Sequence, residues 1–165
     1  ELAGSFNAAD YETVGKNLAE KLKGKIPVIY YSARNLPIAY YWKVNFEETS
    51  KIPAFCNAFP ELNHNEMMGF VSFPDSEFLS DKFNFVFLKD KNDDPRIQKR
   101  MEVTGKLYEE KGFSVEAVGL AGDTIWQKIF DSLSLSNWTS FYLAQNRGVD
   151  PEDISVLETF KKQVV

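Results

Sequence analysis

The sequence predicts an α/β fold, a three-layer α-β-α sandwich with a central parallel sheet of about four or five strands. Short β-rich runs alternate with longer helical patterns, which is typical of parallel sheets. The run from Ile26 to Tyr31 is apolar without alternation, as expected of a strand that is covered on both faces. The chain has 165 residues, which suits one domain with an ordinary core. We therefore expect residues 1–165 to form a single domain.

The first half of the chain predicts two pairs of a helix and a strand. A helix is expected over about Ala9–Lys23, where leucine and valine recur every four positions and a glycine follows. The strand Ile26–Tyr31 comes next. A second helix is expected over residues 36–50, with proline in its first turn, and a second strand over residues 52–59. The segment Pro60–Glu66, with the sequence PELNHNE, should then open another helix.

The second half predicts two more strands and three helices. Residues 83–89 and 113–120 have strand patterns, and the helix between them should be capped by Asp94. The pattern over residues 123–146 is helical and unusually apolar, and its serine-rich middle leaves room for a break. An apolar stripe this wide indicates a subunit or domain interface as well as core. A shorter helix is expected within residues 151–165.

Composition excludes some partners and sets the expected compartment. The net charge of −5 argues against nucleic acid or an anionic membrane as the main partner. No stretch approaches the roughly 20 apolar residues of a membrane helix, and no signal peptide is evident. The single cysteine, Cys56, lies in an apolar run and is interpreted as a buried hydrophobic residue rather than a nucleophile. We expect a reducing, cytoplasmic location.

The PELNHNE segment contains His64, the only histidine, and it supports two interpretations. Asn63 as N-cap and Glu66 three residues later would form a capping box, which requires no function. However, a turn that follows a strand of a parallel sheet lies at the edge where ligands bind. In the first turn of a helix, His64 would face the positive end of the helix dipole, which favours a neutral ring that can relay protons.

Other site types find less support in the sequence. Glu47 and Glu48 are expected at the end of a helix, where acidic residues oppose the helix dipole, so at least one of them should have another role. One histidine, one cysteine and scattered carboxylates argue against a zinc site. The chain has no glycine-rich phosphate-binding motif and no serine on a recognisable nucleophile elbow.

Two segments resemble the C-terminal half of the bifunctional phosphoglucose/phosphomannose isomerases, which belong to the sugar isomerase (SIS) domain superfamily. The family pattern E-N-(S/A)-K-x-P-A-F, followed by a spacer and P-E-L-N-H-N-E, is similar to Glu48–Phe55 and Pro60–Glu66. The tail over residues 141–162 resembles the family's ending, in which a turn precedes a last helix that bears a lysine. This resemblance implies a flavodoxin-type SIS fold.

The resemblance implies reversible aldose–ketose isomerisation of a hexose 6-phosphate through a cis-enediol, with no metal or organic cofactor. Glu48 would be the base that moves a proton between C1 and C2. His64 would assist ring opening and would reach the site of the neighbouring subunit in a homodimer. Lys161 would be the tail lysine near the ring oxygen, and Lys162 is the alternative match.

The resemblance also implies that this chain is incomplete as a catalyst. The Ser/Thr-rich loop that grips the sugar phosphate belongs to an N-terminal SIS domain, which is missing here. Two other functions stay open: a non-catalytic module that binds sugar phosphates, and a dimerisation domain built on the apolar helix over residues 123–146. The presence of both Glu48 and His64 favours the enzyme, because a binding module needs no acid–base pair. The sequence does not decide between glucose and mannose.

Overall fold

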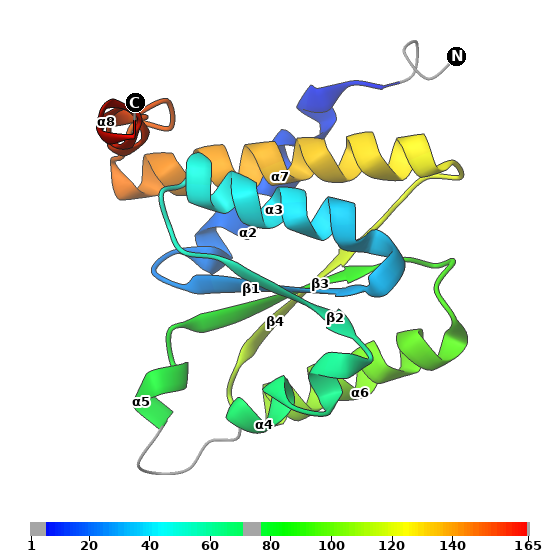
Figure 1. Ribbon diagram of the computed structural model, residues 1–165. Coiled ribbons are helices and arrows are strands. Elements are labelled where there is room, and N and C mark those ends of the chain that lie inside the picture. The colour runs from blue at the N-terminus through cyan, green and yellow to red at the C-terminus, as the bar shows by residue number, and fades with distance from the viewer. Residues whose placement is uncertain (1–5, 71–76, 165) are drawn as a thin grey trace.

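Four parallel strands form the central sheet in the order β2-β1-β3-β4, in a computed structural model that describes residues 6–70 and 77–164 (Figure 1). The strands are β1 (Ile26–Ser32), β2 (Phe55–Phe59), β3 (Phe83–Lys89) and β4 (Ser114–Gly119). Helices cover both faces of the sheet, so the predicted three-layer α/β fold is confirmed. This is the order of a doubly wound sheet. The chain passes from β1 to β2 on one side and then crosses to β3 and β4 on the other side of β1.

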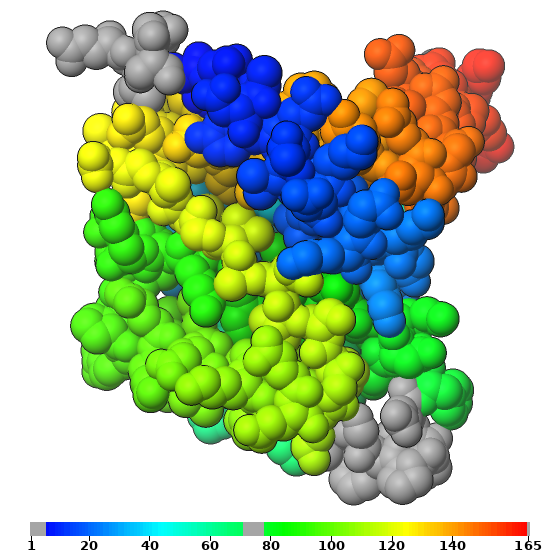
Figure 2. All heavy atoms as spheres, turned by 180° about the vertical axis from the view of Figure 1, so that it is seen from behind, coloured from blue at the N-terminus to red at the C-terminus, as the bar shows by residue number. Residues whose placement is uncertain are grey.

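Three long helices lie on one face of the sheet and one lies on the other. The first layer consists of α2 (Glu12–Leu22), α3 (Leu36–Glu48) and α7 (Ile125–Arg147), while α6 (Pro95–Glu110) covers the second face. The remaining elements are short: η1 (Ala8–Tyr11), η2 (Ala33–Asn35), η3 (Glu61–Asn63), α4 (Glu66–Gly69), α5 (Glu77–Ser80) and α8 (Ser155–Gln163). Seen from behind, α2 lies in the upper half of the view and α6 in the lower half, and α8 lies at an upper corner of the molecule (Figure 2).

The alternation of side chains along the strands divides the core into two clusters. Ile29 and Val86 point toward the layer of α2, α3 and α7, while Tyr30 and Phe85 point toward α6. Both faces are therefore buried, which is why the strand sequences are apolar throughout.

Helix α7 is continuous, and the break that its serine-rich middle allowed is not present. Thr124 and Gln127 form a capping box at its start, and Gly148 ends it with a φ of 67°. Two of its serines face α3: Ser132 accepts a hydrogen bond from the Trp42 indole at 2.9 Å, and Ser136 accepts one from the Asn45 amide at 3.0 Å. Helix α7 packs against α2 and α3, but Ile125, Trp126 and Phe130 remain about half exposed, so the interface role expected of its apolar stripe stays a prediction.

The segment before β2 is a loop rather than the start of the strand. Lys51 has a φ of 54°, which is outside the range of a strand, and β2 begins only at Phe55. The predicted cap of α6 is confirmed, since the Asp94 side chain accepts a hydrogen bond from the Arg96 backbone. None of the helices in the described ranges is long and apolar enough to cross a membrane.

Candidate active site

The PELNHNE segment folds differently from its predicted form. Residues 61–63 form the single 3₁₀ turn η3, His64 is its C-cap, and α4 begins only at Glu66 with Asn65 as N-cap. The predicted capping box of Asn63 and Glu66 is therefore wrong. The Asn63 amide is used elsewhere, because it donates to Thr104 Oγ1 at 2.8 Å. The dipole argument for His64 also fails, since this residue follows a turn instead of opening a helix.

Side chains on both sides of His64 attach the segment to the domain. Asn63 binds Thr104 and accepts a hydrogen bond from Arg100 at 3.3 Å, both on α6. Glu66 accepts hydrogen bonds from the Tyr30 hydroxyl, at 2.8 Å, and from the Asn57 amide. These contacts come from three different elements, so the backbone around His64 is fixed from both directions.

The Tyr30 hydroxyl is a stable donor in this arrangement. The side chain is fully buried, and its hydroxyl lies 3.2 Å from that of Tyr108. Burial, followed by the neighbouring Tyr108 and Glu66, raises the pKa of Tyr30 far above its ordinary value. Tyr30 therefore keeps its proton and holds the Glu66 carboxylate.

The His64 ring itself remains exposed to solvent. Within residues 6–70 and 77–164 it takes part in no side-chain hydrogen bond, in contrast to its neighbours Asn63, Asn65 and Glu66. Its ring nitrogens are thus available to a ligand or to another chain.

Glu48 is the last residue of α3 and is also exposed. The adjacent Glu47 has a structural partner, because Lys43 one turn earlier binds its carboxylate at 2.6 Å. The Glu48 carboxylate accepts no hydrogen bond from the described part of the chain. Only its main-chain carbonyl does, from Lys51 Nζ at 2.5 Å. Of the two glutamates, Glu48 is therefore the one that is free to act on a ligand.

Helix α8, which carries Lys161, is located at the same end of the molecule as the C-terminal end of α3 (Figure 1). Lys51 connects the two regions, since its ammonium also donates to the carbonyl oxygens of Pro151 and Asp153 just before α8. Lys161 is exposed and lies 3.4 Å from Glu158, and Lys162 is exposed as well. The structure thus leaves both lysines accessible.

Glu48 and His64 lie at opposite ends of β2. The end of α3 precedes the strand and the PELNHNE segment follows it, and the five residues of β2 span about 13 Å. One copy of the chain therefore brings Glu48 and α8 to one end and places His64 at the other. The three predicted site residues do not share a cleft within a single chain.

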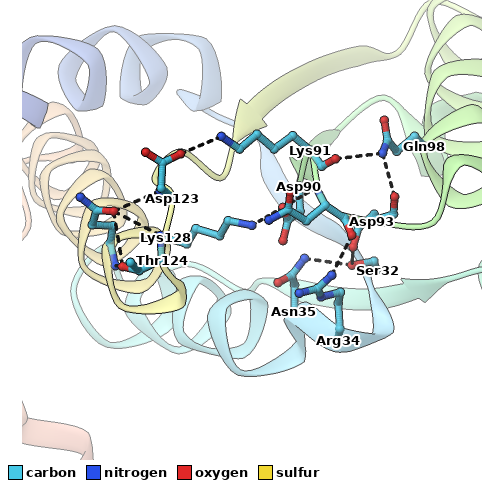
Figure 3. Close-up of polar contacts among 12 residues, drawn as sticks. Ser32, Arg34, Asn35, Asp90, Lys91, Asp93, Gln98, Asp123, Thr124 and Lys128 are labelled. Carbon is cyan, nitrogen blue, oxygen red and sulfur yellow. Dashed lines mark hydrogen bonds and ion pairs between the residues drawn. The ribbon is translucent and has the colours of Figure 1, made fainter.

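A second polar group was not predicted from the sequence. We call it the switch-point cluster, because it fills the crevice between β1 and β3, where the chain leaves the sheet in opposite directions. Each member is at most 5% exposed: Ser32, Asn35, Asp90, Asp93 and Lys128 (Figure 3).

Hydrogen bonds connect most members of the switch-point cluster. Lys128 Nζ lies 2.5 Å from Asp90 Oδ1, as a buried ion pair between the first turn of α7 and the end of β3. Ser32 donates to Asp93 Oδ1 at 2.7 Å and accepts from Asn35 at 2.9 Å. Doubly wound domains bind ligands in this crevice. Here the chain's own side chains occupy it.

The two carboxylates of the cluster differ in their ionisation. Burial opposes the charge on Asp90, but hydrogen bonds from Lys128 and from the Asn92 backbone outweigh it, so the pKa of Asp90 lies below its ordinary value. Burial raises the pKa of Asp93, and Asp90 adds to this, while the bond from Ser32 opposes it. One oxygen of each carboxylate, Oδ2, is buried and has no hydrogen-bond partner among the described residues.

The other candidate chemistries gain no support. Cys56 is half-buried, and burial raises the pKa of its thiol, so the thiolate that a nucleophile requires is disfavoured. In the described ranges, no three side chains of His, Cys, Asp or Glu are grouped so that they could hold a metal ion.

Comparison with known proteins gives consistent matches. The family described as bacterial phospho-glucose isomerase C-terminal SIS domain matches residues 12–164. A bifunctional phosphoglucose/phosphomannose isomerase of Thermoplasma acidophilum is 35% identical over 99% of this chain and 51% of its own length. The enzyme of the same name from Aquifex aeolicus is 31% identical over 96% of this chain and 48% of its own length.

A solved structure agrees on the fold. A glucose-6-phosphate isomerase like protein from Thermus thermophilus superposes with a TM-score of 0.69 at 20% identity, covering 90% of this chain and 46% of the other. The chain thus spans about half the length of the relatives that it matches.

Proposed function

Because this chain belongs to the family of bacterial phosphoglucose isomerase C-terminal SIS domains, we propose that it is one half of a phosphosugar isomerase. The reaction is the aldose–ketose isomerisation of glucose 6-phosphate, mannose 6-phosphate or both to fructose 6-phosphate. The names of the relatives from Thermoplasma acidophilum and Aquifex aeolicus support this reaction class. A cytoplasmic location suits such a substrate and the single unpaired cysteine.

The proposed mechanism is a proton transfer through a cis-enediol. His64 assists opening of the sugar ring, and Lys161 lies near the ring oxygen. Glu48 then removes the proton from C2 of the open-chain aldose. The carbonyl oxygen at C1 takes up a proton as the enediol forms, and Glu48 returns its proton to C1 as the C2 hydroxyl becomes the ketone. All atoms of the substrate are retained, so no redox cofactor is consumed.

This proposal rests on two accessible side chains, Glu48 and His64, whose neighbours in the sequence are bound to other parts of the domain. Glu47 is paired with Lys43 while Glu48 is unpaired within the described residues. Asn63 and Glu66 bind the domain while His64 is exposed. A segment that served only to cap a helix would not need this division of roles.

The opposite placement of Glu48 and His64 supports a site shared between two copies. In a two-fold dimer, the end of α3 from one subunit can meet the PELNHNE segment of the other, and the symmetry creates two equal sites. The polar side chains of the switch-point cluster are buried against one another, so they are not available to bind the phosphate group of the substrate. We propose that an N-terminal SIS domain supplies that phosphate site.

The test is an isomerase assay of the intact protein with single substitutions. Glu48→Gln and His64→Ala should each lower kcat by roughly 100-fold or more, because each removes a group that transfers protons. Glu47→Gln is the matched control and should retain activity, since Glu47 is bound to Lys43. Full activity in both Glu48→Gln and His64→Ala would refute the proposal in favour of a non-catalytic module.

Mixing the two inactive variants tests the shared site. If His64 acts on the partner's site, subunits carrying Glu48→Gln and His64→Ala will form mixed dimers with one intact site each. Equal mixing with subunit exchange should restore about one quarter of the wild-type activity. Without any recovery, both residues act within one subunit.

A further inference from the structure

The backbone at Lys51 adopts a conformation that is unusual for its residue type. Lys51 has a φ of 54°, and it is the one non-glycine residue in the described ranges with a positive φ. The left-handed region is unfavourable for side chains with a Cβ, so it persists only where the surrounding contacts stabilise it. Lys51 follows Glu48 by three residues, directly after α3.

The Lys51 ammonium makes three contacts that explain this conformation. It donates to the carbonyl oxygens of Glu48 at 2.5 Å, Asp153 at 2.5 Å and Pro151 at 3.3 Å. The first belongs to the end of α3, and the other two belong to the turn that precedes α8. These segments are about 100 residues apart in the sequence. An ammonium has three donors on one atom, which suits three convergent carbonyls.

A second cation joins the end of α7 to the residues that follow α3. Arg147, at the end of α7, donates to the carbonyl oxygens of Ser50 at 2.5 Å and of Lys51 at 2.9 Å. Both cations bind only main-chain oxygens here. The contacts therefore fix the backbone while the side chains of Glu48 and Lys161 remain accessible.

Helix α8 depends on this junction because it has little packing of its own. No residue of α8 is buried, and its apolar side chains, Phe160 among them, are largely exposed. Its position relative to α3 is thus set mainly by the turn over residues 148–154, which Lys51 holds.

We propose that Lys51 is a positioning residue, whose ammonium joins the end of α3 to the start of α8 and thereby fixes the Glu48 carboxylate relative to Lys161. This inference rests on the proposed isomerase function for its catalytic consequence. The structural consequence, the attachment of α8 to the end of α3, does not depend on that function.

The experiment replaces Lys51 by Asn in the intact protein. Asparagine tolerates a positive φ, so the backbone requirement is met and the ammonium is removed. Amide hydrogen exchange in α8 should become about tenfold faster, since the helix loses its attachment. The kcat should fall by roughly 10- to 100-fold from misplacement of Glu48, with the pH profile of kcat unchanged, because no titrating catalytic group is removed.

Control and rescue variants separate positioning from general damage. Lys25→Asn is the matched control: Lys25 also donates to a carbonyl, of Asp81 at 2.7 Å, but it joins segments that carry no candidate site residue. It should leave α8 exchange and kcat unchanged. Lys51→Arg keeps a cationic donor and should recover part of both properties. Lys51→Gln, which keeps most of the aliphatic stem, gives the same two readouts if the Asn variant does not fold.

The outcomes distinguish this proposal from the proposed function. Unchanged exchange in α8 together with unchanged kcat in Lys51→Asn would overturn the positioning role. Faster exchange in α8 while Glu48→Gln and His64→Ala stay fully active would refute the catalytic roles of Glu48 and His64 and keep the structural attachment. An altered pH profile in Lys51→Asn would contradict a purely positional role.

Discussion

The PELNHNE segment and the switch-point cluster both follow strands at the carboxyl edge of the sheet, yet they use polar side chains in opposite ways. In the PELNHNE segment, Asn63 and Glu66 are hydrogen-bonded to other parts of the domain, while the His64 ring is exposed to solvent. In the switch-point cluster, every polar side chain is buried against other members, as Lys128 is against Asp90. Position at the carboxyl edge is therefore not sufficient for a ligand site. The polar groups must also remain accessible and unpaired.

The largest expected effect is the loss of the buried cation from the switch-point cluster. Lys128→Ala should lower the free energy of unfolding by about 3–5 kcal/mol, because it leaves the Asp90 carboxylate buried without its partner. Chemical denaturation of the intact protein measures this value. Lys91→Ala, which removes an exposed pair with Asp123, should cost less than about 1 kcal/mol. Equal losses in the two variants would mean that the cluster is not an integral part of the core.

A smaller loss is expected for the anchor of the PELNHNE segment. Glu66→Ala should lower the free energy of unfolding by about 1–3 kcal/mol, because the buried Tyr30 hydroxyl loses its acceptor. Glu66→Gln is the isosteric control. Its amide oxygen can still accept from Tyr30, so thermal or chemical unfolding should show a clearly smaller change. The comparison would fail if Glu66→Ala were as stable as the wild type.

The pH dependence of the free energy of unfolding should show the raised pKa of Asp93. Its folded-state pKa is raised, mainly by burial, so the folded protein holds this proton more tightly than the unfolded chain does. Its contribution to stability therefore decreases as the pH rises from about 4, the ordinary pKa of an aspartate, through the raised value. Asp93→Asn mimics the protonated form. Its free energy of unfolding relative to the wild type should thus increase over that range.

Charged groups near Asp93 also contribute to the pH dependence of the free energy of unfolding. Asp90, Lys128 and Arg34 face or adjoin Asp93 and are present in both proteins. The lowered pKa of Asp90 gives the opposite trend, with stability lost as the pH falls, and that contribution largely cancels in the difference. A difference that stays constant between about pH 4 and pH 8 would contradict a raised pKa at Asp93.

The smallest stability effect is expected at His64. His64→Ala should change the free energy of unfolding by less than about 0.5 kcal/mol, because the exposed ring makes no hydrogen bond with the described residues. The same substitution should strongly reduce isomerase activity. A loss of stability as large as that of Glu66→Ala would instead assign His64 a structural role.

The fold could be predicted because its determinants are local. The apolar run of β1 and the Asp94 cap of α6 depend on neighbouring residues in the sequence, and both are confirmed. The Asn63 cap was wrong because Arg100, 37 residues away, binds the side-chain oxygen that a cap would use, and α4 begins only at Glu66. Local rules contain no information about such a competitor.

The same limit explains why the switch-point cluster was missed. Its members come from β1, from η2, from the loop that follows β3, and from α7. Asp90 and Asp93 directly follow a predicted strand and could have suggested a polar site at that edge. Lys128, however, has the sequence environment of an exposed helical lysine, and only the packing of α7 over the crevice buries it. The predicted roles of Glu48, His64 and Lys161 remain predictions.

Helix α7 also has a mechanical role that follows from its two basic residues. Lys128 binds Asp90 at one end of the helix, and Arg147 binds the carbonyls of Ser50 and Lys51 at the other. The uninterrupted helix between these two residues rises by about 28 Å. The helix therefore spans the sheet and is attached near both of its edges by a basic side chain. A sliding motion of α7 along its axis would strain both attachments together.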